Sequence, residues 1–205
     1  MLRLSNEDQK ALTTFAQEII RLPSPPTHEK AVAERLAREM EWAGLQDVRI
    51  DRIGNVIGRA GDGNGPRLLF NAHMDTVGIS DREAWSRDPY GGELVDGVLY
   101  GRGAVDMKGP LAALIHGLRL VLASGTPLHG ELWVAGVVQE EPCEGYAMQV
   151  LVEEEGVAPD MVVLCEPSNL QVATGQRGRM EMVVTVRGRA AHASTPEQGE
   201  NAIYA

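Results

Sequence analysis

Almost continuously apolar stretches of strand length alternate with helical patterns along this chain, and this alternation limits the folds open to it. Residues 131–138 and 161–165 are apolar nearly throughout and rich in Val, as strands buried on both faces of a sheet are. Between residues 110 and 122, apolar side chains recur at helical spacing instead. We therefore expect an α/β fold, with a mixed, mostly parallel sheet flanked by helices.

The rest of the chain contains further patterns of both kinds. Ser5 and Asp8 have the form of a capping box before a helix, and Thr27 can cap a second helix that Gly44 ends. The other expected elements are hairpins around 54–55 and 96–97, a strand over 67–70, a helix over 146–155, a fully buried strand over 161–165, an alternating strand over 179–187 and the opening of a helix over 196–205. Because the sequence stops inside that last pattern without a cap, we expect a fragment.

The charge balance excludes several classes of partner. Asp and Glu number 29 against 19 Lys and Arg, so the formal net charge is −10. Since no Lys/Arg run offers a phosphate footprint, we expect no nucleic-acid partner, and an anionic membrane surface would repel the chain. No apolar stretch reaches the roughly 18 residues that a membrane span needs, and the N-terminus lacks the apolar region of a signal peptide.

The cysteine count bears on the compartment. Cys143 and Cys165 are the two cysteines of the chain, too few for a disulfide framework. We expect both to be small buried side chains in a reducing environment, which favours a cytoplasmic location.

Acidic or histidine side chains follow four of the expected strands. They are His73 and Asp75, Asp106, Glu140 and Glu141, and Glu166. One such residue means little, because Asp and Glu often follow strands in loops. Four successive cases indicate a shared site, since ligands of open α/β sheets bind at the carboxyl ends of strands. We expect these side chains to converge there.

The residue types in this set suit a metal site. Imidazole and carboxylates are ligands for Zn²⁺ and its first-row neighbours. Asp75, two residues after His73, can accept the second ring N–H of that histidine. Glu140 and Glu141 can divide two tasks, one binding metal and the other taking a proton from a metal-bound water.

Five motifs of this chain occur together, in the same order, in one known family. They are residues 73–77 (HMDTV), 101–109 (GRGAVDMKG), 140–141 (EE), 166–167 (EP) and 188–193 (GRAAHA). Over nearly its whole length the chain resembles the M20 metallopeptidases, which include acetylornithine deacetylase, succinyl-diaminopimelate desuccinylase, aminoacylase and carboxypeptidase G2. Further motifs look closest to a poorly characterised branch of deacetylases and selenium-metabolism-linked hydrolases; they lie at residues 139–145, 175–181 and 199–204.

The resemblance implies a site for two divalent metal ions, with Zn²⁺ expected and Co²⁺ or Mn²⁺ as alternatives. His73 and Glu166 would ligate one ion, Glu141 would hold the other, and Asp106 would bridge the two. Glu140 would serve as general base and acid.

The resemblance also implies how the reaction proceeds. Asp75 would orient His73, and His192 would stabilise the oxyanion from a lid domain, across a dimer. A metal-activated water would hydrolyse the amide bond of an N-acyl amino acid or small peptide. The implied partners are that small substrate and, in the full-length protein, a second copy in a homodimer.

The implied domains are a zinc-peptidase-like catalytic domain over residues 1–178 and the start of an α+β lid or dimerisation domain over 179–205. Family members are longer, and a distal C-terminal His supplies the last ligand of the ion held by Glu141. Because this sequence lacks that His, we expect the 205-residue chain alone to hydrolyse amides poorly or not at all. A catalytically silent metal-binding domain is the alternative hypothesis.

Some residues keep two interpretations. Arg177 and Arg179 can bind a substrate carboxylate or form salt bridges within a strand pair. Lys108 can support the loop of Asp106 or lie in solvent. His116 lies off the apolar face of its expected helix, and we do not expect it to bind metal.

Overall fold

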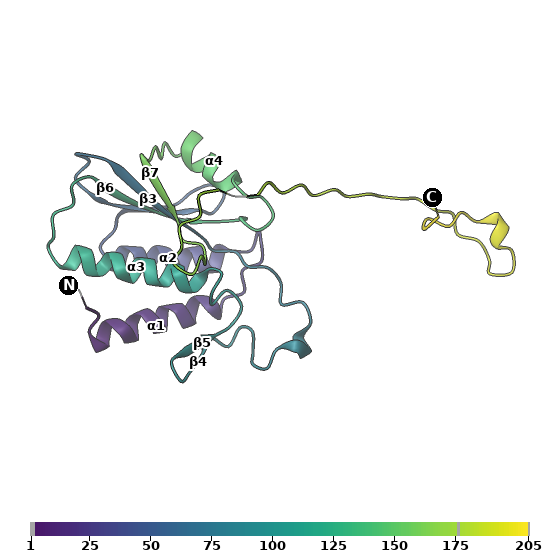
Figure 1. Ribbon diagram of the computed structural model, residues 1–205, viewed down its shortest axis with the longest axis horizontal. Coiled ribbons are helices and arrows are strands. Elements are labelled where there is room, and N and C mark those ends of the chain that lie inside the picture. The colour runs from purple at the N-terminus through teal and green to yellow at the C-terminus, as the bar shows by residue number, and fades with distance from the viewer. Residues whose placement is uncertain (1–2, 176, 205) are drawn as a thin grey trace. The chain divides into compact units, whose positions relative to one another are not determined.

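The computed structural model describes residues 3–175 and 177–204. They form two compact units, divided between Leu170 and Gln171, and each is described by itself. The first unit contains the α-helices and both sheets (Figure 1). Its elements are α1 (Asn6–Ile20), α2 (Lys30–Trp42), β1 (Gln46–Ile50), β2 (Val56–Gly61), β3 (Arg67–His73), η1 (Arg82–Ala84), β4 (Glu93–Val95), β5 (Val98–Tyr100), α3 (Lys108–Ala123), β6 (Glu131–Val137), α4 (Tyr146–Glu153) and β7 (Met161–Leu164).

The main sheet has five strands in the order β1-β2-β6-β3-β7. β1 with β2 and β2 with β6 are antiparallel, whereas β6 with β3 and β3 with β7 are parallel. The expected mixed α/β sheet is therefore confirmed, with half of its pairings parallel. β3 and β6 pair from Arg67 with Glu131 to His73 with Val137, so the residues that follow both strands emerge together.

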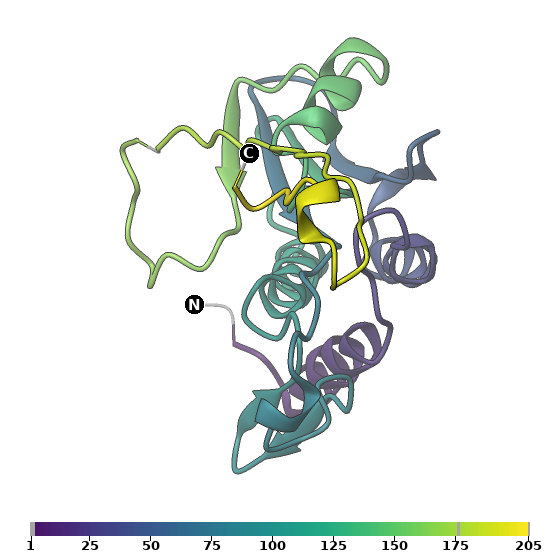
Figure 2. The same ribbon diagram turned by 90° about the vertical axis from the view of Figure 1, so that its right-hand side faces the viewer.

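Helices cover both faces of this sheet. α2 and α3 lie on one face, with α1 packed against them on the side away from the sheet, and α4 lies on the other face, as Figures 1 and 2 show. Two clusters of buried apolar residues match these layers. One joins Phe15, Leu36 and Ile115 of the three helices to the sheet, and the other joins Leu151 of α4 to Leu69. In the described part of the chain, no helix combines the length and apolarity that a membrane span requires.

The starts of the first two helices differ in how they are capped. Ser5 caps α1 with the expected capping box, which Asp8 completes. The expected cap at Thr27 is wrong, because α2 begins later, with Glu29 at its N-cap. Thr27 instead has a φ of 73° and precedes the helix. Gly44 follows α2 with a φ of 93°, as a helix-ending glycine does.

The strand expected over 161–165 is present as β7, but the expectation that it is fully buried is wrong. Its four side chains are 42–59% exposed, because β7 pairs with β3 on one side and ends the strand order on the other. The cysteines also differ from expectation. Cys143 is exposed and Cys165 is only partly buried.

The second unit contains less regular structure than the sequence predicts. Residues 179–187 form no strand, because none of the described residues pairs with them, and Val183 is 85% exposed. The helix expected from Pro196 is limited to the short 3₁₀ helix η2 (Pro196–Gln198). Among the described residues of this unit, the β-type pairing is one isolated antiparallel bridge between Arg189 and Glu200. The domain boundary between residues 178 and 179 stays a prediction.

Candidate metal centre

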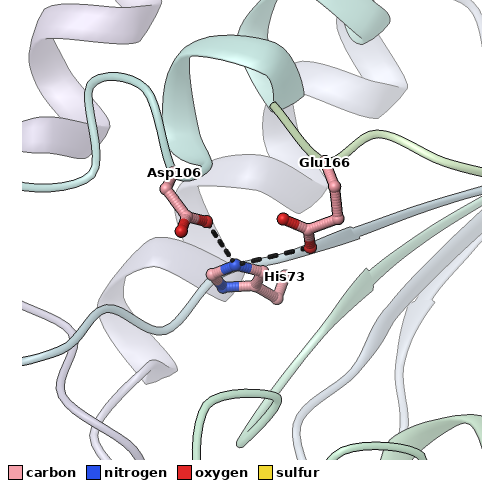
Figure 3. Close-up of side chains that lie close together, drawn as sticks. All are labelled: His73, Asp106 and Glu166. Atoms are coloured by element: carbon pink, nitrogen blue, oxygen red, sulfur yellow. Dashed lines mark hydrogen bonds and ion pairs between the residues drawn. The ribbon is translucent and has the colours of Figure 1, made fainter. Parts of the chain in front are cut away.

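Three side chains from different parts of the first unit point toward one another at the carboxyl ends of the parallel strands (Figure 3). His73 ends β3, Asp106 lies in the loop before α3, and Glu166 follows β7. Asp106 Oδ1 is 2.9 Å and Glu166 Oε1 is 3.8 Å from His73 Nε2. One ligand atom from each lies within 4.8 Å of the others. The parallel pairing of β3 with β7 produces this convergence.

His73 is 2% exposed, and Asp75 holds its ring. Nδ1 lies 2.8 Å from the backbone carbonyl oxygen of Asp75 and 3.5 Å from its carboxylate. Nδ1 therefore donates a hydrogen bond to Asp75, and Nε2 faces the carboxylates of Asp106 and Glu166. Burial lowers the pKa of His73, but the carboxylates of Asp75 and Asp106 outweigh this effect and raise it to about 9. A proton and a metal ion compete for Nε2 at such a position.

The carboxylates of the site repel one another. Burial raises the pKa of Glu166; His73 opposes this rise, and the nearby charges of Asp106 and Glu141 add to it. A carboxylate that is costly to ionise beside two others is stabilised by a cation among them. Asp106, Glu141 and Glu166 therefore form a site that favours a bound cation.

The donor set fits a divalent metal ion. Imidazole nitrogen and carboxylate oxygen are both ligands of Zn²⁺, and catalytic zinc sites combine three protein ligands with a further position left to water or substrate. Asp106 and Glu166 are 54% and 45% exposed, whereas His73 is buried. The ligand atoms thus have a buried side toward β3 and an open side toward solvent.

Glu140 and Glu141 follow β6 and are held by Asp75. The Glu140 N–H donates to Asp75 Oδ1 and the Glu141 N–H to Asp75 Oδ2, each at 3.1 Å. Burial raises the pKa of Glu140; His73 opposes this effect, and the charges of Glu166, Glu141 and Asp75 reinforce it. A carboxyl group with a raised pKa is suited to accepting and returning a proton near neutral pH.

Not every expected site residue belongs to the cluster. The three-residue group within 4.8 Å does not include Glu141, although the charge of Glu141 reaches Glu166. His192 lies in the second unit, where Ser194 Oγ is 2.8 Å from its Nδ1. Arg179 forms an exposed ion pair with Glu181 at 3.7 Å, and Arg177 is exposed.

Two buried side chains support the centre, and the sequence indicated only the second of them, Lys108. Ser24, in the loop between α1 and α2, is fully buried and donates to the carbonyl oxygen of Met74 at 2.8 Å. Lys108 is 1% exposed, and its Nζ donates to the Leu22 carbonyl oxygen of the same loop at 2.7 Å. Burial lowers the pKa of Lys108 to about 8. Lys108 therefore supports the loop of Asp106 and does not lie in solvent.

Met107 provides a further contact to the centre. The His73 N–H donates to Met107 Sδ at 3.1 Å, and the peptide bond between Asp106 and Met107 is cis. The contact has no sequence signal, because it joins the loop before α3 to the end of β3.

Comparison with known sequences places the chain among peptidases. A model of the peptidase family M20/M25/M40 matches residues 69–200. The chain is 40% identical over 205 residues to the uncharacterised protein YgeY of Escherichia coli (strain K12), covering 100% of this chain and 50% of that protein. It is 33% identical over 211 residues to a succinyl-diaminopimelate desuccinylase of Maricaulis maris (strain MCS10), covering 98% and 54%. The chain spans about half the length of the curated relatives it matches.

Solved structures share the fold. The M20 family metallo-carboxypeptidase Sso-CP2 of Sulfolobus solfataricus superposes with a TM-score of 0.66 at 19% identity, covering 78% of this chain and 37% of that one. The YXEP protein of Bacillus subtilis, described as a dinuclear metal-binding peptidase of the M20 family, gives 0.58 at 16% identity, covering 76% and 42%. Because the family model matches residues 69–200, more than half of the chain and the whole set of proposed site residues, the chain belongs to the peptidase family M20/M25/M40.

Proposed function

We propose that this chain carries the metal centre of a hydrolase that cleaves the amide bond of N-acyl amino acids or small peptides. One observation carries the proposal: His73, Asp106 and Glu166 meet within 4.8 Å, beside a Glu140 whose pKa is raised. This combines a set of metal ligands with a group able to move a proton. The relationship to a succinyl-diaminopimelate desuccinylase supports amide chemistry.

His73, Asp106 and Glu166 would hold one divalent ion, and Asp106 and Glu141 would hold a second. We propose Zn²⁺ for both, with Co²⁺ or Mn²⁺ as alternatives, since imidazole and carboxylates suit all three. When bound, such ions lower the pKa of water and polarise the carbonyl of the substrate.

The side chains of this chain would supply the remaining chemistry. Glu140 takes a proton from the attacking water and returns it to the nitrogen of the leaving amine. Asp75 fixes the ring of His73 through Nδ1 and holds Glu140 through its backbone N–H. His192 would stabilise the negative charge on the former carbonyl oxygen.

The setting of the protein is also part of the proposal. The acidic net charge of −10 and the small number of cysteines favour a cytoplasmic protein without nucleic-acid or membrane partners. We propose a homodimer for the full-length protein, with His192 acting between subunits.

A second candidate function is metal binding without turnover. It is favoured by the position of Glu141, which lies outside the three-residue cluster. The second ion would then have fewer ligands than the first.

The test combines metal loading with an amide-hydrolysis assay. The Zn²⁺-loaded chain at high concentration is assayed with N-acetyl amino acids, N-succinyl amino acids and dipeptides as substrates. The variant Glu140→Gln and a matched control from the same loop, Glu144→Gln, are assayed in the same way. We expect slow turnover that Glu140→Gln abolishes while the metal stays bound, and that Glu144→Gln leaves unchanged. Turnover that survives Glu140→Gln contradicts the proposal. Bound metal without turnover in the full-length protein as well as in this chain supports the second candidate.

A further inference from the structure

The backbone that leads from β6 into Glu140 and Glu141 is held at every residue. This stretch is the 138–141 segment. Each of its four N–H groups donates to a side chain from elsewhere in the sequence. The pairs are Val138 with Asn55 Oδ1 at 3.1 Å, Gln139 with Glu29 Oε1 at 3.0 Å, and Glu140 and Glu141 with the two carboxylate oxygens of Asp75 at 3.1 Å each.

Glu29 is an unusual member of this set because it is a buried carboxylate. It is 4% exposed, and its Oε1 accepts from both the Gln139 N–H and the Thr27 N–H, the latter at 3.1 Å. A buried carboxylate is costly unless hydrogen bonds compensate it. Glu29 is also the N-cap residue of α2, where the partial positive charge of a helix start favours a negative group.

Both donors to Glu29 have a left-handed backbone. Gln139 has a φ of 55° and Thr27 a φ of 73°, a region that residues with a Cβ rarely occupy. Such a conformation persists where the surrounding contacts enforce it. Because Gln139 immediately precedes Glu140, its conformation determines the direction in which Glu140 leaves the sheet.

Asn55 secures the start of the same segment. It is fully buried, and its Nδ2 donates to Asp51 Oδ2 at 2.8 Å. This bond fixes the amide so that Oδ1 faces the Val138 N–H. Asp51 is itself anchored, since its Oδ1 accepts the N–H groups of residues 53–55.

We propose that Glu29 is a positioning residue for the metal centre. Its buried carboxylate holds Gln139 in the left-handed conformation and thereby aims Glu140 and Glu141, while Asn55 secures Val138. The roles of Glu140 and Glu141 rest on the proposed function. The hold of Glu29 on the 138–141 segment does not depend on that function.

The first arm of the test measures that hold by amide hydrogen exchange with NMR detection. The readout is the exchange rate of the Gln139 amide divided by that of Val134, a buried residue of β6, which corrects for global stability. Glu29→Met keeps the volume and removes the acceptor, so we expect the ratio to rise about tenfold. Glu29→Gln keeps a carbonyl oxygen at this place, and its ratio should stay near that of the wild type.

Glu39→Met is the matched control. Glu39 lies on the same helix, is 7% exposed and pairs with Arg35 and His116, so the variant removes a buried carboxylate without touching the segment. Its ratio should not change. An unchanged ratio in Glu29→Met, or an equal rise in Glu39→Met, overturns the proposal. If Glu29→Met does not fold, Glu29→Ser gives the same readout with space for water in place of the lost side chain.

The second arm follows Co²⁺ binding by visible absorption. We expect Glu29→Met to weaken the second, more weakly held Co²⁺ ion about tenfold and to leave the first ion unchanged. If the Gln139 amide exchanges faster but the affinity for the second Co²⁺ ion is unchanged, Glu29 has a structural role only and the proposed positioning role is overturned. A wild-type chain that binds no Co²⁺ contradicts the proposed function, and the exchange ratio still decides whether Glu29 holds the segment.

Discussion

Asp75 contacts both the histidine and the two glutamates of the metal centre. Its carbonyl oxygen accepts from His73, and its carboxylate accepts from the N–H groups of Glu140 and Glu141. Asp75→Asn would turn an NH₂ group toward one of these N–H groups and remove a negative charge. We expect Zn²⁺ affinity, measured by calorimetry, to fall by about 10- to 100-fold.

Asp160→Asn is the control for that change. Asp160 also accepts a backbone N–H with its carboxylate, that of Arg67, at 2.7 Å, but at the opposite end of β3. Its substitution should leave Zn²⁺ affinity unchanged. An equal loss of affinity in both variants would mean that Asp75 supports the sheet rather than the centre.

At the scale of single residues, the motifs predict which side chains gather but not which atoms meet. His73, Asp106 and Glu166 do come together. However, His73 Nδ1 lies closer to the backbone oxygen of Asp75 than to the carboxylate expected to orient it. Glu29 lies 110 residues before Gln139, and no local pattern indicates a contact between residues so far apart.

The start of α3 determines where Asp106 lies. A Cβ at Gly109 would overlap the backbone carbonyl oxygen of Ala104, so Gly109→Ala must displace the loop that carries Asp106. We expect a loss of about 1–3 kcal/mol in the free energy of unfolding, as overpacking causes, and weaker Zn²⁺ binding in the same samples.

Gly117 on the same helix provides the matched comparison. A Cβ there meets nothing within 4 Å, so Gly117→Ala should stabilise α3 by about 0.5–1 kcal/mol through helix propensity. Zn²⁺ affinity should not change. If Gly109→Ala binds Zn²⁺ as well as Gly117→Ala does, the approach of Gly109 to Ala104 does not position Asp106.

A buried hydrogen bond between Glu39 of α2 and His116 of α3 joins the two helices, and Glu39 predicts a pH effect. Burial raises the pKa of Glu39, but hydrogen bonds from His116 and Arg35 outweigh it and lower the pKa below the usual 4.5. The stabilisation is therefore complete above that value and is lost as pH falls through the folded-state pKa. Relative to the wild type, Glu39→Gln should lose about 1–3 kcal/mol at neutral pH.

Denaturant unfolding across the acid range checks this prediction. The difference between the wild type and Glu39→Gln should shrink as the pH falls below 4.5. Glu34→Gln, an exposed change on the same helix, should show almost no difference at any pH. A difference for Glu39→Gln that does not vary with pH would contradict the contribution assigned to the Glu39 carboxylate.

At the scale of elements, periodicity predicts the first unit well and the second poorly. The hairpins, the main strands and the four helices form where apolar spacing indicates. The alternating pattern of 179–187 forms no strand, since a strand requires a partner and the described residues provide none. His116 is 2% exposed although it lies off the apolar face of α3, because Glu39 of α2 satisfies its ring.

At the scale of the whole molecule, the first unit contains every proposed site residue except His192. A chain with a net charge of −10 concentrates several of its carboxylates at the ends of β3, β6 and β7. Burial raises the pKa values of Glu140 and Glu166, and the repulsion among these carboxylates adds to the rise. A divalent cation at this place would relieve that repulsion.

Calorimetric titration of the chain with Zn²⁺, with Asp106→Asn beside the wild type, measures whether these carboxylates hold a cation. We predict one tightly bound ion per wild-type chain, since His73, Asp106 and Glu166 provide three ligands and an open position, and the loss of that ion in Asp106→Asn. No binding by the wild type, or binding that Asp106→Asn leaves unchanged, would contradict the account.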